Sequence, residues 1–130
     1  MRLWYTFLLC SVVFFGWAHR GNSHEMSPAY PKFVFSHLEG LMKTTVNIFN
    51  RRKDVSFFEI EVFDEDWNPL PFAAQSRLLQ LQYLEKKSVN VYIRRKDLNR
   101  VEYVCTRSKI FMGEGTTKVS SKICSRVKNE

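Results

Sequence analysis

The sequence predicts an all-β fold in which two sheets pack as a sandwich. From about residue 31 onward, apolar and polar residues alternate with a period of two, which is the pattern of strands that bury one face. Turn residues divide this pattern into seven short runs, and no run has a convincing helical period. Seven strands without a helix are typical of an immunoglobulin-like β-sandwich.

Polar turns separate the first three predicted strands. The turn at residues 37–40 contains a glycine, and the loop at residues 50–54 (NRRKD) is charged, so both are interpreted as solvated connections. In the third run Phe58, Ile60 and Val62 alternate with glutamates, which predicts one buried and one exposed face. The three strands are residues 31–35 (PKFVF), 42–49 (MKTTVNIF) and 55–63 (VSFFEIEVF), after an irregular segment at residues 24–31 (HEMSPAYP).

Four further strands follow a connection at residues 64–72 (DEDWNPLPF), which holds two prolines. The last turn is at residues 113–115 (GEG). Tyr103 stands two residues before Cys105, where such sandwiches keep a tyrosine whose hydroxyl bonds back to the chain. The four strands are residues 75–82 (QSRLLQLQ), 88–93 (SVNVYI), 101–109 (VEYVCTRSK) and 118–128 (KVSSKICSRVK).

Residues 1–23 predict a secretory signal peptide. Arg2 precedes an apolar run from Leu3 to Ala18 without an acidic residue, and this run is shorter than the roughly 20 residues that span a bilayer. Small residues permit cleavage after Ala18 or after Ser23. We therefore expect an exported protein, periplasmic in a Gram-negative cell and secreted otherwise, in which residues 24–130 form one domain.

Two cysteines, Cys105 and Cys124, follow the predicted signal peptide. An even number of cysteines in an exported chain favours a disulfide. The second predicted strand has no cysteine, which excludes the bridge between sheets that antibody domains carry, and Cys124 lies on the strand that follows that of Cys105. We expect a cross-strand disulfide that closes about 20 residues and contributes roughly 3 kcal/mol to stability.

Nucleophilic and metal chemistry have weaker support in the sequence. A catalytic cysteine needs a histidine as its base, and His24 and His37 lie in leader or loop sequence. If cleavage makes His24 the amino terminus, its amine and imidazole could bind copper together with His37. We place this copper-binding alternative below a protein-binding role because it depends on one cleavage point.

The charge pattern favours a protein partner. The formal net charge of +7 suits carboxylates, acidic chains or anionic surfaces. The basic groups at residues 51–53 and 94–96 lie at strand ends beside turns and are interpreted as solvated loops, and export separates the protein from nucleic acid. Glu59 and Glu61 share a solvent face, which disfavours acid–base catalysis. We expect no enzymatic activity, no cofactor, no metal and no nucleic-acid binding.

Three segments occur in a recognisable order: Ser76–Leu81 (SRLLQL), Ser88–Ile93 (SVNVYI) and Asn99–Val104 (NRVEYV). They resemble the P-x-L-x-x-L strand, the strand after it, and the R-E-x-x-(F/Y) start of the sixth strand in the N-terminal domain of periplasmic pilus (PapD-like) chaperones. A Leu-Glu-Lys-Lys turn and Ala74 replace a common Pro-Gly turn and a usual proline. The resemblance covers about residues 31–128; family members continue into a second sandwich, so we expect no full two-domain cleft within this sequence.

The resemblance implies a partner-binding site. In that family one basic residue at the first strand and another near the end of the last strand hold the C-terminal carboxylate of a pilus subunit, and the last strand lends alternate apolar side chains to the subunit. Lys32 and Lys128 take the basic positions here, without the bidentate fork of arginine. The apolar residues of the lending face are Val119, Ile123 and Val127, and two serines interrupt this face.

We therefore expect an exported, non-enzymatic domain that binds a pilus or secretion subunit by strand addition and carboxylate anchoring. The alternative is a structural or adhesive module of a pilus or secretion apparatus. Edge strands also leave open a dimer of the chain.

Overall fold

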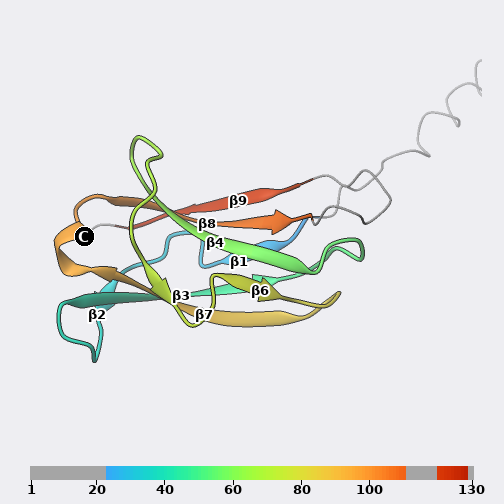
Figure 1. Cartoon of the computed structure of the whole chain (residues 1–130), viewed down its shortest axis with the longest axis horizontal. Coiled ribbons are helices and arrows are strands. Elements are labelled where there is room, and N and C mark those ends of the chain that lie inside the picture. The colour runs from blue at the N-terminus through green and yellow to red at the C-terminus, as the bar shows by residue number, and fades with distance from the viewer. Residues whose placement is uncertain (1–22, 111–119, 129–130) are drawn as a thin grey trace, which may run out of the picture.

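The computed structural model describes residues 23–110 and 120–128. Two antiparallel sheets pack face to face, and the strands of both run along the long axis of the molecule (Figure 1). In chain order the elements are β1 (Glu25–Ser27), β2 (Val34–Phe35), β3 (Leu41–Phe49), β4 (Phe57–Asp64), β5 (Ala73–Ala74), β6 (Leu78–Gln80), β7 (Lys86–Arg94), the 3₁₀ helix η2 (Arg95–Asp97), β8 (Val101–Lys109) and β9 (Lys122–Arg126).

The first sheet is built around the long pair β3 and β7. Its strand order is β1-β3-β7-β5, and β2 also pairs with β3. Strand β1 pairs with the end of β3 near Phe49, whereas β2 pairs with the other end, where Phe35 lies opposite Met42. Two short strands therefore share one edge of β3, and the segment between them leaves this edge.

The second sheet has the order β6-β4-β8-β9, which makes β9 an edge strand. Strands β4 and β8 pair over their whole length, with one register shift between Phe63 and Asp64. Strand β9 pairs with β8, and Cys105 lies directly opposite Cys124.

The core lies between the sheets and follows the alternation of the sequence. In β4 the side chains of Phe58, Ile60 and Val62 are buried, and the residues between them face outward. Burying one such side chain contributes about 1.5–3 kcal/mol. The core cluster also includes Met42, Val46, Ile48, Val91, Ile93, Val101, Val104 and Val127.

The predicted all-β, immunoglobulin-like sandwich is confirmed, but two segments differ from the prediction. Residues 24–31 are not entirely irregular, because Glu25–Ser27 forms β1. The predicted strand at residues 75–82 is shorter, because only Leu78–Gln80 forms β6, which pairs with β4 in the second sheet; β5, just before this segment, pairs with β7 in the first sheet. Arg77 stabilises this crossing, since its guanidinium donates to the Phe72 carbonyl at 2.7 Å and lies over the Phe72 ring.

The predicted signal peptide and the turn at residues 113–115 lie outside the described residues. Within residues 23–110 and 120–128, no helix has the length and apolar character needed to cross a bilayer.

Candidate functional site

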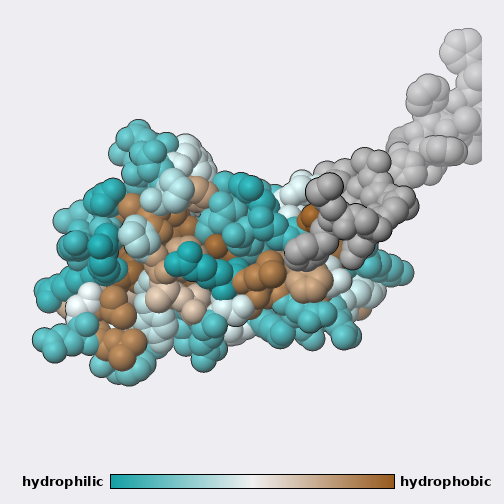
Figure 2. Space-filling view, in the orientation of Figure 1, coloured by the Kyte–Doolittle hydropathy of each residue, from teal (hydrophilic) through white to brown (hydrophobic). Residues whose placement is uncertain are grey.

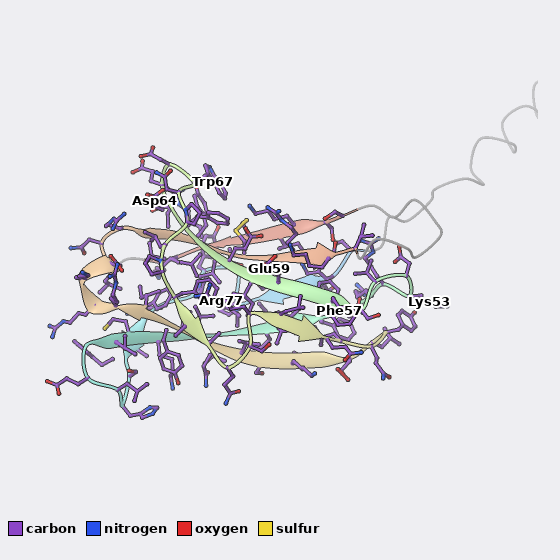
Figure 3. The ribbon with its side chains drawn as sticks, in the orientation of Figure 1. Lys53, Phe57, Glu59, Asp64, Trp67 and Arg77 are labelled. Carbon is purple, nitrogen blue, oxygen red and sulfur yellow. A yellow bond between two sulfur atoms is a disulfide. The ribbon has the colours of Figure 1, made fainter. Side chains whose placement is uncertain are left out.

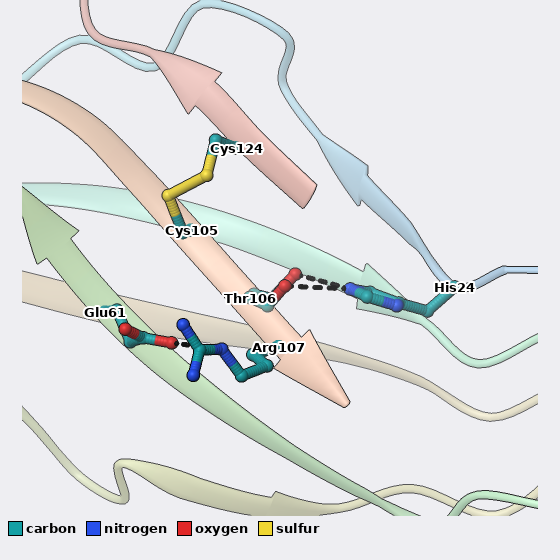
Figure 4. The surroundings of a disulfide bond; sticks show 6 residues. All are labelled: His24, Glu61, Cys105, Thr106, Arg107 and Cys124. Carbon is teal, nitrogen blue, oxygen red and sulfur yellow. Dashed lines mark hydrogen bonds and ion pairs between the residues drawn. A yellow bond between two sulfur atoms is a disulfide. The ribbon is translucent and has the colours of Figure 1, made fainter. Parts of the chain in front are cut away.

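The candidate site is the exposed edge of the second sheet, formed by β9, together with the chain segments at its C-terminal end. A disulfide joins Cys105 of β8 to Cys124 of β9 (Figure 4). The bridge confirms the predicted cross-strand pairing. It fixes the register of the edge strand against β8, because the two cysteines are direct partners in the ladder.

Beyond β9 the chain joins two segments that are far apart in the sequence. The backbone N–H of Val127 donates to the Glu102 carbonyl at 2.8 Å, and that of Lys128 donates to the Pro31 carbonyl at 2.9 Å. Lys128 therefore lies beside the segment that contains Lys32, and both lysines are exposed. The backbone bond thus places Lys128 next to the residue that precedes Lys32, the other basic residue that the family resemblance singles out.

The three apolar residues proposed for the lending face have different environments. Ile123 is half-buried, and Val127 is buried as part of the domain's own core. Ser125, between them, is also buried. Val119 lies outside the described residues. The face that holds Ile123, Ser125 and Val127 is therefore directed into the sandwich, with Ile123 the more accessible of the two apolar side chains.

A buried histidine, which the sequence did not single out for this place, links β1 to the second sheet. The His24 ring is 1% exposed, its Nε2 lies 2.7 Å from Thr106 Oγ1 and 3.2 Å from the Thr106 carbonyl, and its Nδ1 lies 3.1 Å from Ser121 Oγ. A carbonyl can only accept, so Nε2 carries the proton and Nδ1 of the neutral ring accepts from Ser121. Figure 4 shows the ring reaching Thr106 from the start of β1.

The environment of His24 disfavours its charged form. Burial lowers the pKa of His24 below its ordinary value, and the positive charge of Arg52 acts in the same direction. The hydrogen bond to the Thr106 carbonyl opposes the shift. The ring also lies against Phe58, with 4.8 Å between the ring centroids.

Residues 50–54 are not a fully solvated loop, so the sequence interpretation was wrong for two of them. Asn50 is fully buried: its amide donates to the Val55 and Leu81 carbonyls at 2.8 and 2.9 Å. Arg52 is 7% exposed and forms a two-point contact with Asp54. The loop sequence alone does not indicate this burial, because Asn50 also bonds to Leu81 and Arg52 also lies 3.5 Å from Ser108 Oγ, and both partners are distant in the sequence.

The copper alternative conflicts with the positions of the two histidines. His24 lies near the Phe49 end of β3, because Glu25 pairs with Phe49, whereas His37 lies in the turn that precedes the other end. Eight steps of about 3.3 Å along the nine residues of β3 separate these ends, or roughly 26 Å. Both ring nitrogens of His24 also have hydrogen-bond partners. These two residues therefore do not form one metal site in this fold.

Tyr103 has a different partner from the one the sequence suggested. Its ring stacks on Trp67, with 4.0 Å between centroids and 5° between planes. Trp67 belongs to the loop after β4, which Asp64 closes by accepting from the N–H groups of Asp66 and Asn68. Trp67 and Asp64 project from the sheet together (Figure 3), and Trp67 has a positive φ of 64°.

Glu59 and Glu61 lie on the outer face of β4, as the alternation predicts. Each pairs with a cation of the neighbouring strand β8: Glu59 with Lys109 at 2.6 Å and Glu61 with Arg107 at 3.1 Å. Cross-strand pairs of opposite charge support sheet pairing.

Comparison with known proteins adds information about the fold. No protein-family model and no curated protein matches the sequence. Among solved structures, the chain is similar to the E. coli chaperone DraB, with a TM-score of 0.56 and 16% sequence identity. The match covers 81% of this chain and 53% of DraB, so the chain spans about half the length of that chaperone. At this identity the likeness concerns the fold.

Proposed function

We propose that this chain is an exported, non-enzymatic protein-binding domain that acts in the manner of pilus chaperones. Its partner is a pilus or secretion subunit whose C-terminal carboxylate lies between Lys32 and Lys128. The partner strand then extends the second sheet along β9. Residues 24–130 constitute this domain, after removal of the signal peptide at residues 1–23, and the protein works in the periplasm.

The observation that carries this proposal is the hydrogen bond from the Lys128 N–H to the Pro31 carbonyl, at 2.9 Å. It places the backbone of Lys128 beside the residue that precedes Lys32, at the end of an edge strand, and both lysines are exposed. A carboxylate at this position gains charge-assisted hydrogen bonds. The backbone beyond it meets the outer side of β9, where strand addition supplies main-chain hydrogen bonds.

Side chains of β9 support the same mode of binding. Ile123 is half-buried on the face directed into the sandwich, so an added strand would place its own inward side chains beside Ile123 and extend the core. Val127 would act mainly from within the core of the domain, since it is 6% exposed. The serines on this face predict weaker apolar contact than a continuous apolar strand would give.

The disulfide supports export and edge-strand binding together. A cysteine pair of this kind forms in an oxidising compartment. Because it joins β9 to β8, it keeps the edge strand in one register while a partner binds.

The test is capture of a C-terminal peptide from a pilus subunit, made once with a free carboxylate and once as the amide. We expect the wild-type protein to prefer the free acid by roughly ten-fold, a value consistent with one charge-assisted contact. The Lys32→Ala/Lys128→Ala variant should bind both peptides equally and weakly.

The matched control is Lys43→Ala/Lys86→Ala, which removes the same charge from the first sheet, away from β9. This variant should keep the preference for the free acid. If the control loses the preference as completely as the Lys32/Lys128 variant does, the effect comes from net charge and the carboxylate site is excluded.

A further inference from the structure

A second exposed surface lies at the end of the sandwich formed by β2, the turn after it, and η2. We define the β2 tip as Val34, Phe35, Leu38, Arg95 and Lys96. Val34, Phe35 and Leu38 are 48%, 72% and 44% exposed. Figure 1 shows the turn after β2 projecting from this end, and Figure 2 shows hydrophobic residues exposed there among hydrophilic ones.

Two cations are held against these apolar groups. The N–H of Arg95 donates to the Gly40 carbonyl at 2.9 Å, which fixes η2 beside the turn that follows β2. The guanidinium of Arg95 lies 5.1 Å from the centre of the Phe35 ring. Lys96 follows on the same short helix and is exposed.

The acid of η2 does not neutralise these cations. Asp97 is 2% exposed and pairs with Arg94 at 2.7 Å and with Arg100 at 3.4 Å. Among the described residues, no ion pair involves Arg95 or Lys96. Glu39 is the one acid within the turn itself. The tip therefore combines protruding apolar side chains with net positive charge.

We propose that the β2 tip binds an anionic lipid surface peripherally. Phe35 and Leu38 would enter the headgroup region, and Arg95 and Lys96 would contact anionic lipid headgroups. Exposed apolar side chains with flanking cations are the combination that holds a protein in a membrane interface. A second copy of the chain is a poorer occupant, because a symmetric contact would place these cations against themselves.

The test is co-sedimentation with vesicles of phosphatidylcholine, alone or mixed with phosphatidylglycerol, using the protein purified after export. We expect sedimentation with the mixed vesicles and little with the neutral ones. Phe35→Ser should weaken binding roughly ten-fold, since an apolar side chain is lost from the interface. Arg95→Gln and Lys96→Gln should each weaken binding about five-fold.

The chain contains a matched control at its opposite end. Tyr83 is 46% exposed and has Lys53 above its ring at 5.2 Å, which reproduces the Phe35 and Arg95 contact. Figure 3 shows Lys53 at the end of the molecule away from β2. Tyr83→Ser should bind vesicles as the wild type does. Equal binding to neutral and mixed vesicles, or equal loss in Phe35→Ser and Tyr83→Ser, would overturn the proposal.

This inference is independent of the carboxylate site. Phe35 is largely exposed, so Phe35→Ser should leave the melting temperature nearly unchanged and should still capture the free-acid peptide. Loss of vesicle binding with peptide capture intact supports the lipid surface. A wild-type protein that captures the peptide but does not sediment with mixed vesicles excludes the lipid surface alone.

Discussion

His24 Nε2 lies 2.7 Å from the hydroxyl of Thr106, a residue 82 positions further along the chain. This contact joins the first strand of one sheet to the interior of the other. On the other side of the ring, Ser121, just before β9, donates its hydroxyl proton to Nδ1. The position of the edge strand is therefore coupled to a titratable group.

The His24 contact predicts that stability falls in acid. The pKa of His24 is lowered in the folded protein, so the unfolded chain takes up a proton first as the pH decreases. The contribution of the neutral ring is complete above the ordinary histidine pKa of about 6.5 and is lost as the pH falls through the folded value. Urea unfolding at a series of pH values between about 7 and 5 measures this loss.

His24→Gln should flatten that pH dependence, because glutamine stays neutral. The control is His37→Gln, which changes an exposed histidine in the turn after β2. The groups that face His24 are Thr106, Ser121, Phe58 and Arg52. A pH profile of His24→Gln that matches the wild type would exclude His24 as the responsible group.

The disulfide predicts a measurable loss of stability on reduction. Cys105 and Cys124 are 19 positions apart, and a loop of about this length contributes roughly 3 kcal/mol through the entropy of the unfolded chain. The Cys105→Ser/Cys124→Ser variant should therefore unfold at a lower urea concentration than the wild type, and its free energy of unfolding should be smaller by about this amount. Dithiothreitol should destabilise the wild type and leave the double variant unchanged; an equal effect on both would show that the reductant acts elsewhere.

The stacked rings of Trp67 and Tyr103 predict a coupling energy. Rings at 4.0 Å and nearly parallel contribute about 0.5–1.5 kcal/mol beyond their buried area. A double-mutant cycle with Trp67→Ala and Tyr103→Ala, measured by urea unfolding, isolates this quantity. The same cycle with Trp67 and Tyr83 should give additive effects, since Tyr83 lies in the turn before β7 and has Lys53 as its partner.

The buried side chain of Asn50 predicts a large loss of folding stability when it is shortened to alanine. Its side chain satisfies the carbonyls of Val55 and Leu81 and the N–H of Arg52, and it is fully buried. Asn50→Ala would leave these three groups without their partner and should cost about 3 kcal/mol. Asn90→Ala, which removes one exposed contact to Thr45, should cost less than about 1 kcal/mol. If Asn50→Ala and Asn90→Ala lost similar stability, water would have to take the place of the Asn50 side chain as the hydrogen-bond partner of these three groups.

Local patterns determined much of the fold. The alternation in residues 42–49, 55–63 and 101–109 is long enough to indicate both the strand and its buried face, and these segments contain β3, β4 and β8. The pairing of Cys105 with Cys124 followed from their places on consecutive strands. Lys32 and Lys128 were found through a family resemblance, and their adjacency depends on a backbone bond to Pro31.

Only the tertiary structure decided the short strands and the buried polar residues, because these depend on segments that are distant in the sequence. Three residues at Glu25–Ser27 are too few to show a period, and they become a strand because β3 offers an edge. Within residues 73–80 the chain passes from one sheet to the other, because β5 pairs with β7 and β6 pairs with β4. His24 and Asn50 are buried because distant segments supply the Thr106 hydroxyl and the Leu81 carbonyl, and the Arg52 guanidinium lies 3.5 Å from the Ser108 hydroxyl. The sequence pattern indicates which apolar residues are buried. A polar residue can be buried only where the packed fold supplies its hydrogen-bond partners, and these depend on the tertiary structure.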